Sequence, residues 1–361
     1  MYIKYLKIKN FRNINDCHIR PNKKLNFILG KNAQGKTNLI ETIYYSSLFK
    51  SFRTNKNINL INKDSESFFI DINIINNNVN NKLKISLDKK NKKEIFINEK
   101  KPDNKNFYKI LNSIIYFPDE ISYLKNYPAY RRNLIDRSIF YINNNYINIY
   151  KKYKKCLKQR NIYLKFEDDN NDIWKDQLIE YAYSIIIERI NYLERINIYF
   201  EALNKKTENK EKYSIKYNYN NKDKEKIKDN LFEKFKINEN KEKKYGFTLT
   251  GPHIDDFIFS VNDNNINMYS SEGQKRSLLL NYKQAQLLDY KDSYGYYPIL
   301  LFDDMGSELD LCRKKNIFNK ILDNSGQVFI TTMDIPDINK NETTMFEVID
   351  GHFSEFISNE G

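Results

Sequence analysis

Residues 30–37 read Gly30-Lys31-Asn32-Ala33-Gln34-Gly35-Lys36-Thr37, and this stretch fits the pattern G-x-x-x-x-G-K-[ST] of a phosphate-binding P-loop. The apolar run before it, Leu25–Leu29, predicts a short strand. The segment after it predicts an amphipathic helix, because apolar side chains recur three and four residues apart at Leu39, Ile40, Ile43, Tyr44 and Leu48. A P-loop requires this position between a strand and a helix, so the stretch predicts a site for a nucleoside triphosphate.

The residue types of this loop follow from its chemistry. Glycine at positions 30 and 35 lets the backbone turn its N–H groups toward phosphate oxygens, and the next helix directs its positive end to the same place. We expect Lys36 to contact the β- and γ-phosphates and the Thr37 hydroxyl to bind Mg²⁺. The expected cofactors are therefore ATP and Mg²⁺, and the expected ATP-binding residues are Gly30, Lys31, Asn32, Ala33, Gln34, Gly35, Lys36 and Thr37.

A second apolar run, Ile299–Phe302, ends in two carboxylates and has the form of a Walker B strand. Ligands of open α/β sheets bind at the carboxyl ends of the strands. We expect Asp303 to hold Mg²⁺ together with Thr37, and Asp304 to orient the attacking water as general base. A strand that ends in a solvated acidic turn is common, and the P-loop upstream favours the catalytic interpretation.

The segment Ser271-Glu272-Gly273-Gln274 begins a predicted helix, and Ser271 with Gln274 forms a capping-box pattern. Alone it is an ordinary helix start, but between the other two motifs it matches the signature of ABC-type ATPases, which contacts the γ-phosphate held by another subunit. Less specific matches are a D-loop at Ser307-Glu308-Leu309-Asp310 and the strand end Thr331-Thr332, where a γ-phosphate sensor is expected, with Thr332 as the candidate. The expected catalytic residues are Lys36, Asp304, Ser271, Gly273 and Gln274.

The formal net charge of the 361-residue chain is +13, which favours a polyanionic partner such as DNA. The chain is also rich in Lys, Asn, Ile, Tyr and Phe, the residues of AT-rich codons, so the charge alone leaves both explanations open. No stretch reaches the roughly 18 apolar residues of a membrane span, and the first residues resemble a strand and not a signal peptide. We expect a cytoplasmic protein without a membrane partner, whose three cysteines show no zinc-site spacing.

Strand and helix signals divide the chain in three. Strand patterns dominate residues 1–120, helical patterns dominate 121–244, and strand patterns resume in 245–361, where Phe247–Leu249 and Phe257–Val261 are expected strands. The polar segment Asn204–Lys228 predicts a loop. The expected fold class is α/β: a P-loop ATPase head of ABC or SMC type, assembled from both ends of the chain, with an inserted helical second lobe.

Together with the three motifs above, five further segments closely resemble the bacterial RecF family over nearly the whole chain: Phe11-Arg12-Asn13, Asn38-Leu39-Ile40-Glu41, Tyr116-Phe117-Pro118, Arg131-Arg132 and Thr250-Gly251-Pro252-His253. RecF proteins are SMC-like, ABC-type ATPases of recombinational repair. The resemblance implies binding to duplex, gapped or junction DNA, with single strands as a further substrate, and ATP-driven dimerisation. It also implies recombinase loading with RecR and RecO, replication restart and a part in the SOS response, and it adds Arg12 to the ATP-binding residues.

Hydrolysis in such a protein is expected to be weak, stimulated by DNA and used as a switch, which leaves the assignment as an enzyme open. We expect DNA contacts from Lys151–Arg160, Arg131, Arg132 and the surroundings of Arg12. Three places depart from the family pattern: Ile254 replaces an Arg, Asp119-Glu120 reverses the usual order of acids, and Asn126-Tyr127 replaces Gly-Ser.

Three other functions share some of these motifs. An ABC transporter ATPase subunit has the P-loop, the Walker B strand, the signature and the D-loop, but the long separation of Thr37 from Gly273 disfavours a compact transport head. An SMC-like structural DNA-binding ATPase is disfavoured because the middle region is too short for a long coiled coil. A nucleotide sensor that does not hydrolyse ATP also remains open, and phosphate release measured with and without gapped DNA distinguishes it.

Overall fold

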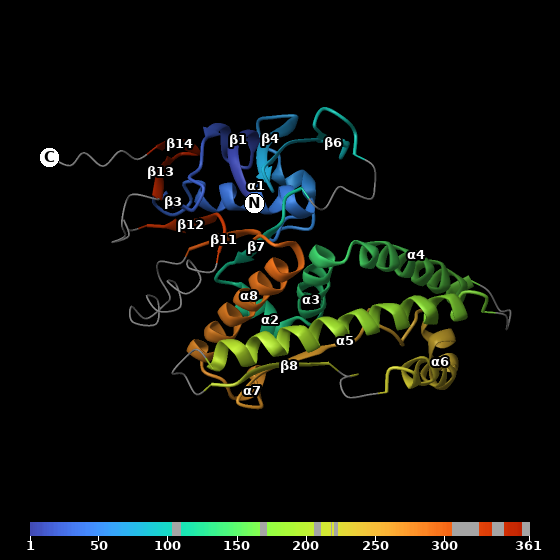
Figure 1. Ribbon diagram of the computed structural model, residues 1–361. Coiled ribbons are helices and arrows are strands. Elements are labelled where there is room, and N and C mark those ends of the chain that lie inside the picture. Colours follow the sequence, from blue (N-terminus) through green and yellow to red (C-terminus); the bar gives the residue numbers. More distant parts are fainter. Residues whose placement is uncertain are drawn as a thin grey trace. The chain divides into compact units, whose positions relative to one another are not determined.

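The structure is a computed structural model, which describes residues 1–102, 110–166, 172–205, 211–217, 219, 223–304, 325–333 and 343–355 (Figure 1). The chain forms two compact units. The first consists of Met1–Glu120 and Gln286–Gly361, and the second of Ile121–Ala285. The first unit is thus assembled from both ends of the chain. Residues 245–285, which the sequence predicted to belong to the head, cluster with the second unit.

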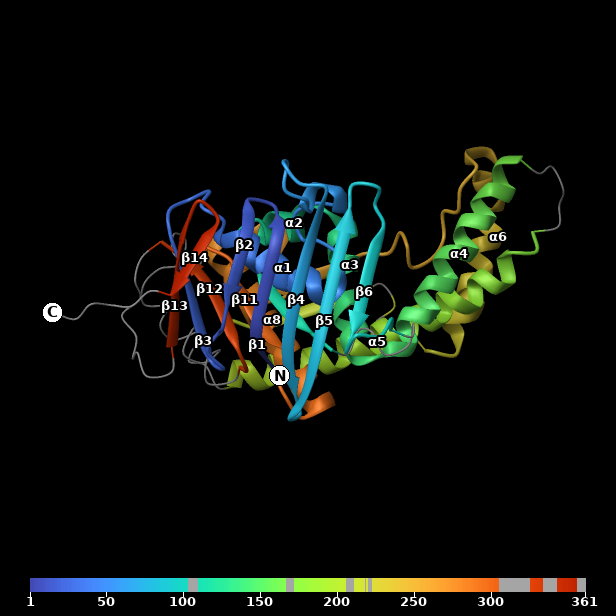
Figure 2. The ribbon, with the colours of Figure 1, turned by 90° about the horizontal axis from the view of Figure 1, so that it is seen from above.

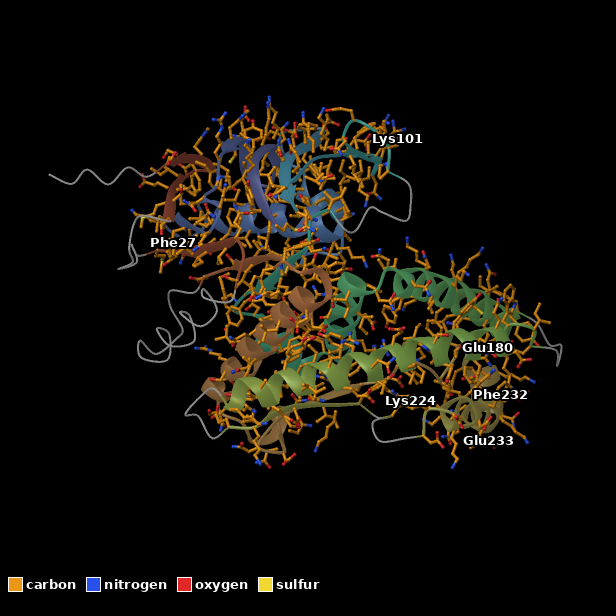
Figure 3. The ribbon with its side chains drawn as sticks, in the orientation of Figure 1. Phe27, Lys101, Glu180, Lys224, Phe232 and Glu233 are labelled. Carbon is orange, nitrogen blue, oxygen red and sulfur yellow. The ribbon has the colours of Figure 1, made fainter. Side chains whose placement is uncertain are left out.

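The P-loop belongs to a six-stranded sheet in the first unit, with the order β14-β13-β3-β12-β11-β7. All neighbouring strands in it are parallel except the antiparallel pair β13 and β14. Its inner strands are short apolar runs because both faces of a parallel sheet are covered, and Phe27 in β3 is an example (Figure 3). The strand bounds are β3 Leu25–Leu29, β7 Ser113–Tyr116, β11 Ile299–Phe302, β12 Val328–Thr332, β13 Thr343–Ile349 and β14 His352–Glu355.

A second sheet of the first unit is antiparallel, has the order β2-β1-β4-β5-β6 and is seen face-on in Figure 2. Alternate side chains of β4 are buried, as expected for a sheet with one face on the core. Helix α1 (Lys36–Leu48) contacts strands of both sheets, and its Tyr45 packs edge-on against Phe68 of β4. The other elements are β1 Tyr2–Phe11, β2 Ile14–Ile19, η1 Asn57–Leu60, β4 Ser67–Asn76, β5 Val79–Asp88 and β6 Lys93–Ile97.

The second unit is mainly helical and is organised around α5 (Lys175–Lys205), which packs against α3, α4 and α6 and against strand β8. Glu180 of α5, labelled in Figure 3, pairs with Lys228 of α6. Helix α8 begins in this unit and continues into the first. The bounds are α2 Glu120–Asn126, α3 Pro128–Ile142, α4 Asn144–Phe166, α6 Lys226–Tyr245, α7 Ile266–Tyr269 and α8 Glu272–Tyr294.

A small antiparallel sheet in the second unit, with the order β10-β9-β8, corrects the sequence analysis in two places. Strand β8 (Tyr213–Tyr217) lies within the predicted loop Asn204–Lys228. This segment forms a strand because its side chains alternate between buried and accessible and its backbone pairs with β9 (Phe257–Val261). Strand β10 is Asn264–Asn265. The predicted strand Phe247–Leu249 is wrong. Its N–H groups at Thr248 and Leu249 donate to side chains and not to a neighbouring strand.

Candidate nucleotide-binding site

The predicted P-loop connects β3 to α1, as the sequence analysis expected. Three of its residues have positive φ angles: Gly30 at 153°, Ala33 at 65° and Gly35 at 116°. Gly35 is the N-cap of α1. A side chain at Gly30 is excluded as well by contact, because a Cβ there would lie 2.6 Å from the carbonyl oxygen of Val348. The glycines therefore permit a backbone conformation and a close approach that other residues would prevent.

The Lys36 ammonium group lies against the backbone of its own loop. It donates to the carbonyl oxygens of Gly30 and Lys31, the second at 3.0 Å. Burial lowers the pKa of Lys36, while the carboxylates of Asp304 and Asp303 act in the opposite direction. The cation expected to neutralise phosphate thus lies at the loop and near the acidic pair of β11.

The Walker B carboxylate meets the P-loop helix directly. The Thr37 hydroxyl donates to Oδ1 of Asp303 at 2.9 Å, and the Thr331 hydroxyl donates to the same oxygen at 2.8 Å. Burial raises the pKa of Asp303, and these two hydrogen bonds lower it. Strands β11 and β12 are parallel neighbours, so their carboxyl ends bring Asp303 and Thr331 together.

These oxygen atoms suit a magnesium ion. Hard cations of this size take carboxylate and hydroxyl oxygens and complete their coordination with phosphate and water. Among the described residues no group of three or more His, Cys, Asp or Glu side chains could hold a metal ion by itself. Thr37 and Asp303 therefore fit Mg²⁺ that arrives with a nucleotide, and they fit the metal-binding roles predicted for them.

Asp304 differs from Asp303 in its surroundings. It has a positive φ angle of 49°, and its N–H donates to the Thr331 hydroxyl oxygen at 2.7 Å. Its Oδ1 atom is buried and has no hydrogen-bond partner among the described residues. A buried acceptor without a partner is costly unless a ligand or water occupies it, which agrees with the predicted role of Asp304 toward water.

Arg12 makes protein contacts at each of its guanidinium nitrogens. Two of them donate to the buried carboxylate of Glu41, at 3.0 and 2.9 Å, and the third donates to the carbonyl oxygen of Asn59. Its role in ATP binding stays a prediction. Arg53, which the sequence analysis did not single out, also contacts Glu41 and donates to Asn38. Its charge lowers the pKa of Asp303, so Arg53 belongs to the electrostatic surroundings of the site.

The capping box predicted at the start of α8 is confirmed. The N–H of Gln274 donates to Ser271 Oγ at 3.2 Å, and the N–H of Ser271 donates to Gln274 Oε1 at 3.0 Å. Ser271 Oγ is the acceptor in this pair, so the bond leaves its own hydrogen able to donate. The catalytic role predicted for Ser271, Gly273 and Gln274 stays a prediction.

Two less specific matches have different outcomes. The predicted D-loop, Ser307–Asp310, lies outside the described residues. The predicted pair Thr331-Thr332 ends β12 as expected, and it is Thr331 whose hydroxyl contacts Asp303. The sequence named the right strand end, and the alternation of side chains along the strand decides which threonine faces the carboxylate.

The arginines expected to contact DNA are engaged within the second unit. Arg131 is buried and donates to both carboxylate oxygens of Asp256, and Arg132 donates to the carbonyl oxygen of Asp255. Arg160 is buried between Asp172 and Glu242. The buried guanidinium groups of Arg131 and Arg160 thus support the fold, whereas Arg132 is only partly buried. The exposed cations of the predicted run are lysines on α4: Lys151, Lys152, Lys154, Lys155 and Lys158.

The three departures from the family pattern are accommodated locally. Ile254 is half exposed, and Glu120 is a fully buried first residue of α2. Tyr127 is the N-cap of α3 with an ordinary φ of −123°, and Asn126 is not among the residues with positive φ, so this turn does not require glycine. In the part of the chain that the structure describes, no helix is both long and apolar enough to span a membrane.

The comparisons agree with this architecture. The family model "RecF/RecN/SMC N terminal domain" matches residues 2–352. The chain is 36% identical to the DNA replication and repair protein RecF of Clostridium beijerinckii, over 97% of this chain and 98% of that one. It is 37% identical to the protein of the same name from Clostridium kluyveri, over 98% and 100%.

Solved structures give the same result. A structure of the recombination mediator protein RecF with ATP, described as part of the RecFOR pathway, matches with a TM-score of 0.88 and 31% identity over 99% of this chain and 98% of that one. An SMC head bound to a ScpA domain matches with a TM-score of 0.58 at 16% identity, which shows a shared fold alone. The ATPase-head fold of ABC and SMC type is thereby confirmed, and the chain belongs to the RecF family.

Proposed function

We propose that the protein is an ATP-dependent DNA-binding protein of recombinational repair and replication restart, in which ATP binding is a switch. The observation that carries the proposal is the hydrogen bond of 2.9 Å between Thr37 and Asp303, because it joins the P-loop to the Walker B strand. The names of the curated relatives and the ATP-bound relative support it.

In this proposal each residue of the site has a distinct task. The N–H groups of the P-loop and the Lys36 ammonium bind the phosphates. Thr37 and Asp303 would hold Mg²⁺, which would supply positive charge to offset that of the phosphates. The Oδ1 atom of Asp304, which has no hydrogen-bond partner in the described part of the chain, accepts a hydrogen bond from the attacking water and then its proton. An aspartate reaches about one methylene less far than a glutamate, so slow, switch-like hydrolysis is expected.

The site is completed by a second copy of the chain. Ser271, Gly273 and Gln274 at the start of α8 contact the γ-phosphate held by the partner, and the capping geometry of Ser271 leaves a donor for this contact. Each subunit gives and receives the same contact, so the dimer is isologous. Because the γ-phosphate contact exists only with ATP, ATP favours the dimer and hydrolysis releases it.

DNA is the proposed partner of the dimer, as duplex, gapped or junction DNA, with single strands as a further substrate. The exposed lysines of α4 and the net charge of +13 support a sequence-independent contact with phosphates. RecR and RecO are proposed as protein partners because the solved relative is described as part of the RecFOR pathway. Recombinase loading, the SOS response and a cytoplasmic location belong to the same proposal.

The test measures DNA affinity as a function of salt with ATP, with ADP and without nucleotide. We expect tighter binding with ATP and a steep salt dependence, with a slope of about −0.9 for each duplex phosphate contact. Equal affinity in all three nucleotide states would exclude a nucleotide switch. A flat salt dependence would exclude the phosphate contacts, and phosphate release with and without gapped DNA separates a switch from a sensor that does not hydrolyse ATP.

A further inference from the structure

The C-terminal β-hairpin of the first unit lies beside the P-loop because of its register. Strand β13 pairs in parallel with β3, and Glu347 is opposite Leu29, the last residue before the P-loop. The hairpin turns directly after Ile349, at the two residues Asp350 and Gly351, which have φ angles of 49° and 78°. Two positive φ angles in a two-residue turn are typical of type I′, for which Asp-Gly is a favoured sequence.

This turn gives both of its N–H groups to one residue of the P-loop. The N–H of Gly351 donates to the carbonyl oxygen of Gln34 at 2.9 Å, and the N–H of Asp350 donates to Gln34 Oε1. Gln34 therefore has its backbone and its side chain fixed by a segment more than three hundred residues away in sequence. The preceding residues Lys31–Ala33 are exposed, and their contacts include the bonds from Lys36 to the Lys31 carbonyl oxygen and from Asn13 to the Ala33 carbonyl oxygen.

Asn13 connects the turn to the rest of the loop. Its amide nitrogen donates to the carbonyl oxygen of Gln34 at 3.2 Å, and its Oδ1 accepts from Asn38 of α1 at 2.6 Å. The space around it is tight, because a Cβ on Gly35 would lie 2.8 Å from Asn13 Oδ1 and a Cβ on Gly351 would lie 2.1 Å from its carbonyl oxygen. A displacement of Asn13 would therefore reach the P-loop and the start of α1 together.

We propose that the Asp350–Gly351 turn is a positioning element of the P-loop, which holds Gln34 so that the N–H groups after it point at phosphate. The inference rests on the ATP binding proposed above. Gln34 immediately precedes Gly35 and Lys36, so a shift of its backbone changes the direction of the donors that follow. The turn itself contacts no nucleotide, and its effect passes through Gln34 and Asn13.

The test compares Gly351→Ala with a matched control, Gly295→Ala. Both glycines belong to the first unit and have nearly equal φ angles, 78° and 79°, so alanine adds the same left-handed strain at each. The new Cβ meets the Asn13 carbonyl oxygen in the first case and nothing within 4 Å in the second. We expect Gly351→Ala to weaken ATP and ADP binding roughly tenfold or more, the value of one misplaced charged hydrogen bond. We expect Gly295→Ala to stay within about twofold of the unmodified protein.

Hydrogen exchange of the nucleotide-free protein gives a readout that does not depend on ligand. We expect faster exchange in residues 30–38 for Gly351→Ala. We expect the same for Gln34→Ala, which removes the hydrogen bond from the Asp350 N–H to Gln34 Oε1 without adding an atom. Exchange in these residues should be unchanged for Gly295→Ala. Unchanged affinity and exchange in Gly351→Ala overturn the inference, as does an equal loss in Gly295→Ala. If the unmodified protein itself fails to bind ATP, the proposed function fails, and the exchange data still decide whether the turn braces the loop.

Discussion

Replacing Thr331 by valine tests whether the Walker B strand end is organised by the neighbouring strand. The fully buried Thr331 hydroxyl donates to Asp303 Oδ1 at 2.8 Å and accepts from the N–H of Asp304 at 2.7 Å. Valine removes both bonds while keeping the branched shape. The part-buried N–H of Asp304 then lacks this partner, at a cost toward the lower end of about 1–3 kcal/mol, and the buried Asp303 carboxylate loses a hydrogen bond worth about 1.5–3 kcal/mol.

The expected loss of stability is about 3 kcal/mol, since the hydrogen bond from Thr37 to Asp303 remains. With a urea dependence of about 2 kcal/mol per molar, the unfolding midpoint should fall by about 1.5 M. The matched control is Thr42→Val, because Thr42 is equally buried and its hydroxyl donates only to the carbonyl oxygen of Asn38 in its own helix. Equal midpoints for the two variants would refute the reasoning, and so would an unchanged rate of ATP hydrolysis in Thr331→Val.

Two further predictions concern single groups. Asp304→Asn should keep ATP affinity within about threefold and slow hydrolysis by about 10²-fold or more, measured by phosphate release, and normal turnover would remove Asp304 as the base. Burial lowers the pKa of His253 from 6.5 to about 4, and its ring bonds to Tyr153 and Thr248. Between about pH 4 and 6.5 the unfolded chain therefore binds a proton at His253 that the folded chain does not. The stability that the neutral, buried ring contributes is complete above pH 6.5, and up to about 3 kcal/mol of the free energy of unfolding is lost as the pH falls toward 4. Urea midpoints at about pH 7 and about pH 5 should differ less in His253→Asn than in the unmodified protein, and an equal difference would contradict the assignment.

Motifs written in consecutive residues could be predicted from the sequence. The P-loop, the Walker B strand and the capping box of Ser271 and Gln274 each depend on local conformation, and the structure forms all three as expected. The sequence also predicted that Thr37 of the P-loop and Asp303 of the Walker B strand lie close together, because the carboxyl ends of parallel strands share one edge of a sheet.

Features that depend on side-chain partners from distant segments could not be predicted. The sequence predicted that Arg131 contacts DNA, but in the structure its guanidinium group pairs with the carboxylate of Asp256. The contact of Thr331 with Asp303 depends on the register of β12 with β11, which sets Ile330 opposite Phe302 and so places Thr331 beside Asp303. The position of Arg53 depends on its contact with Glu41. Strand β8 was missed because the polar residues around it outweigh its own short alternation.

The measurement that tests the central claim most directly is the solution mass by light scattering, with saturating ATP and Mg²⁺ and without nucleotide. We expect the mass of the unmodified protein to double with ATP, and the masses of Lys36→Ala and Ser271→Arg to stay at one chain. The first variant lacks the cation of the P-loop, and the second blocks the helix start that completes the partner's site. A mass that stays at one chain for the unmodified protein, or that doubles with ATP in Lys36→Ala, would contradict the account.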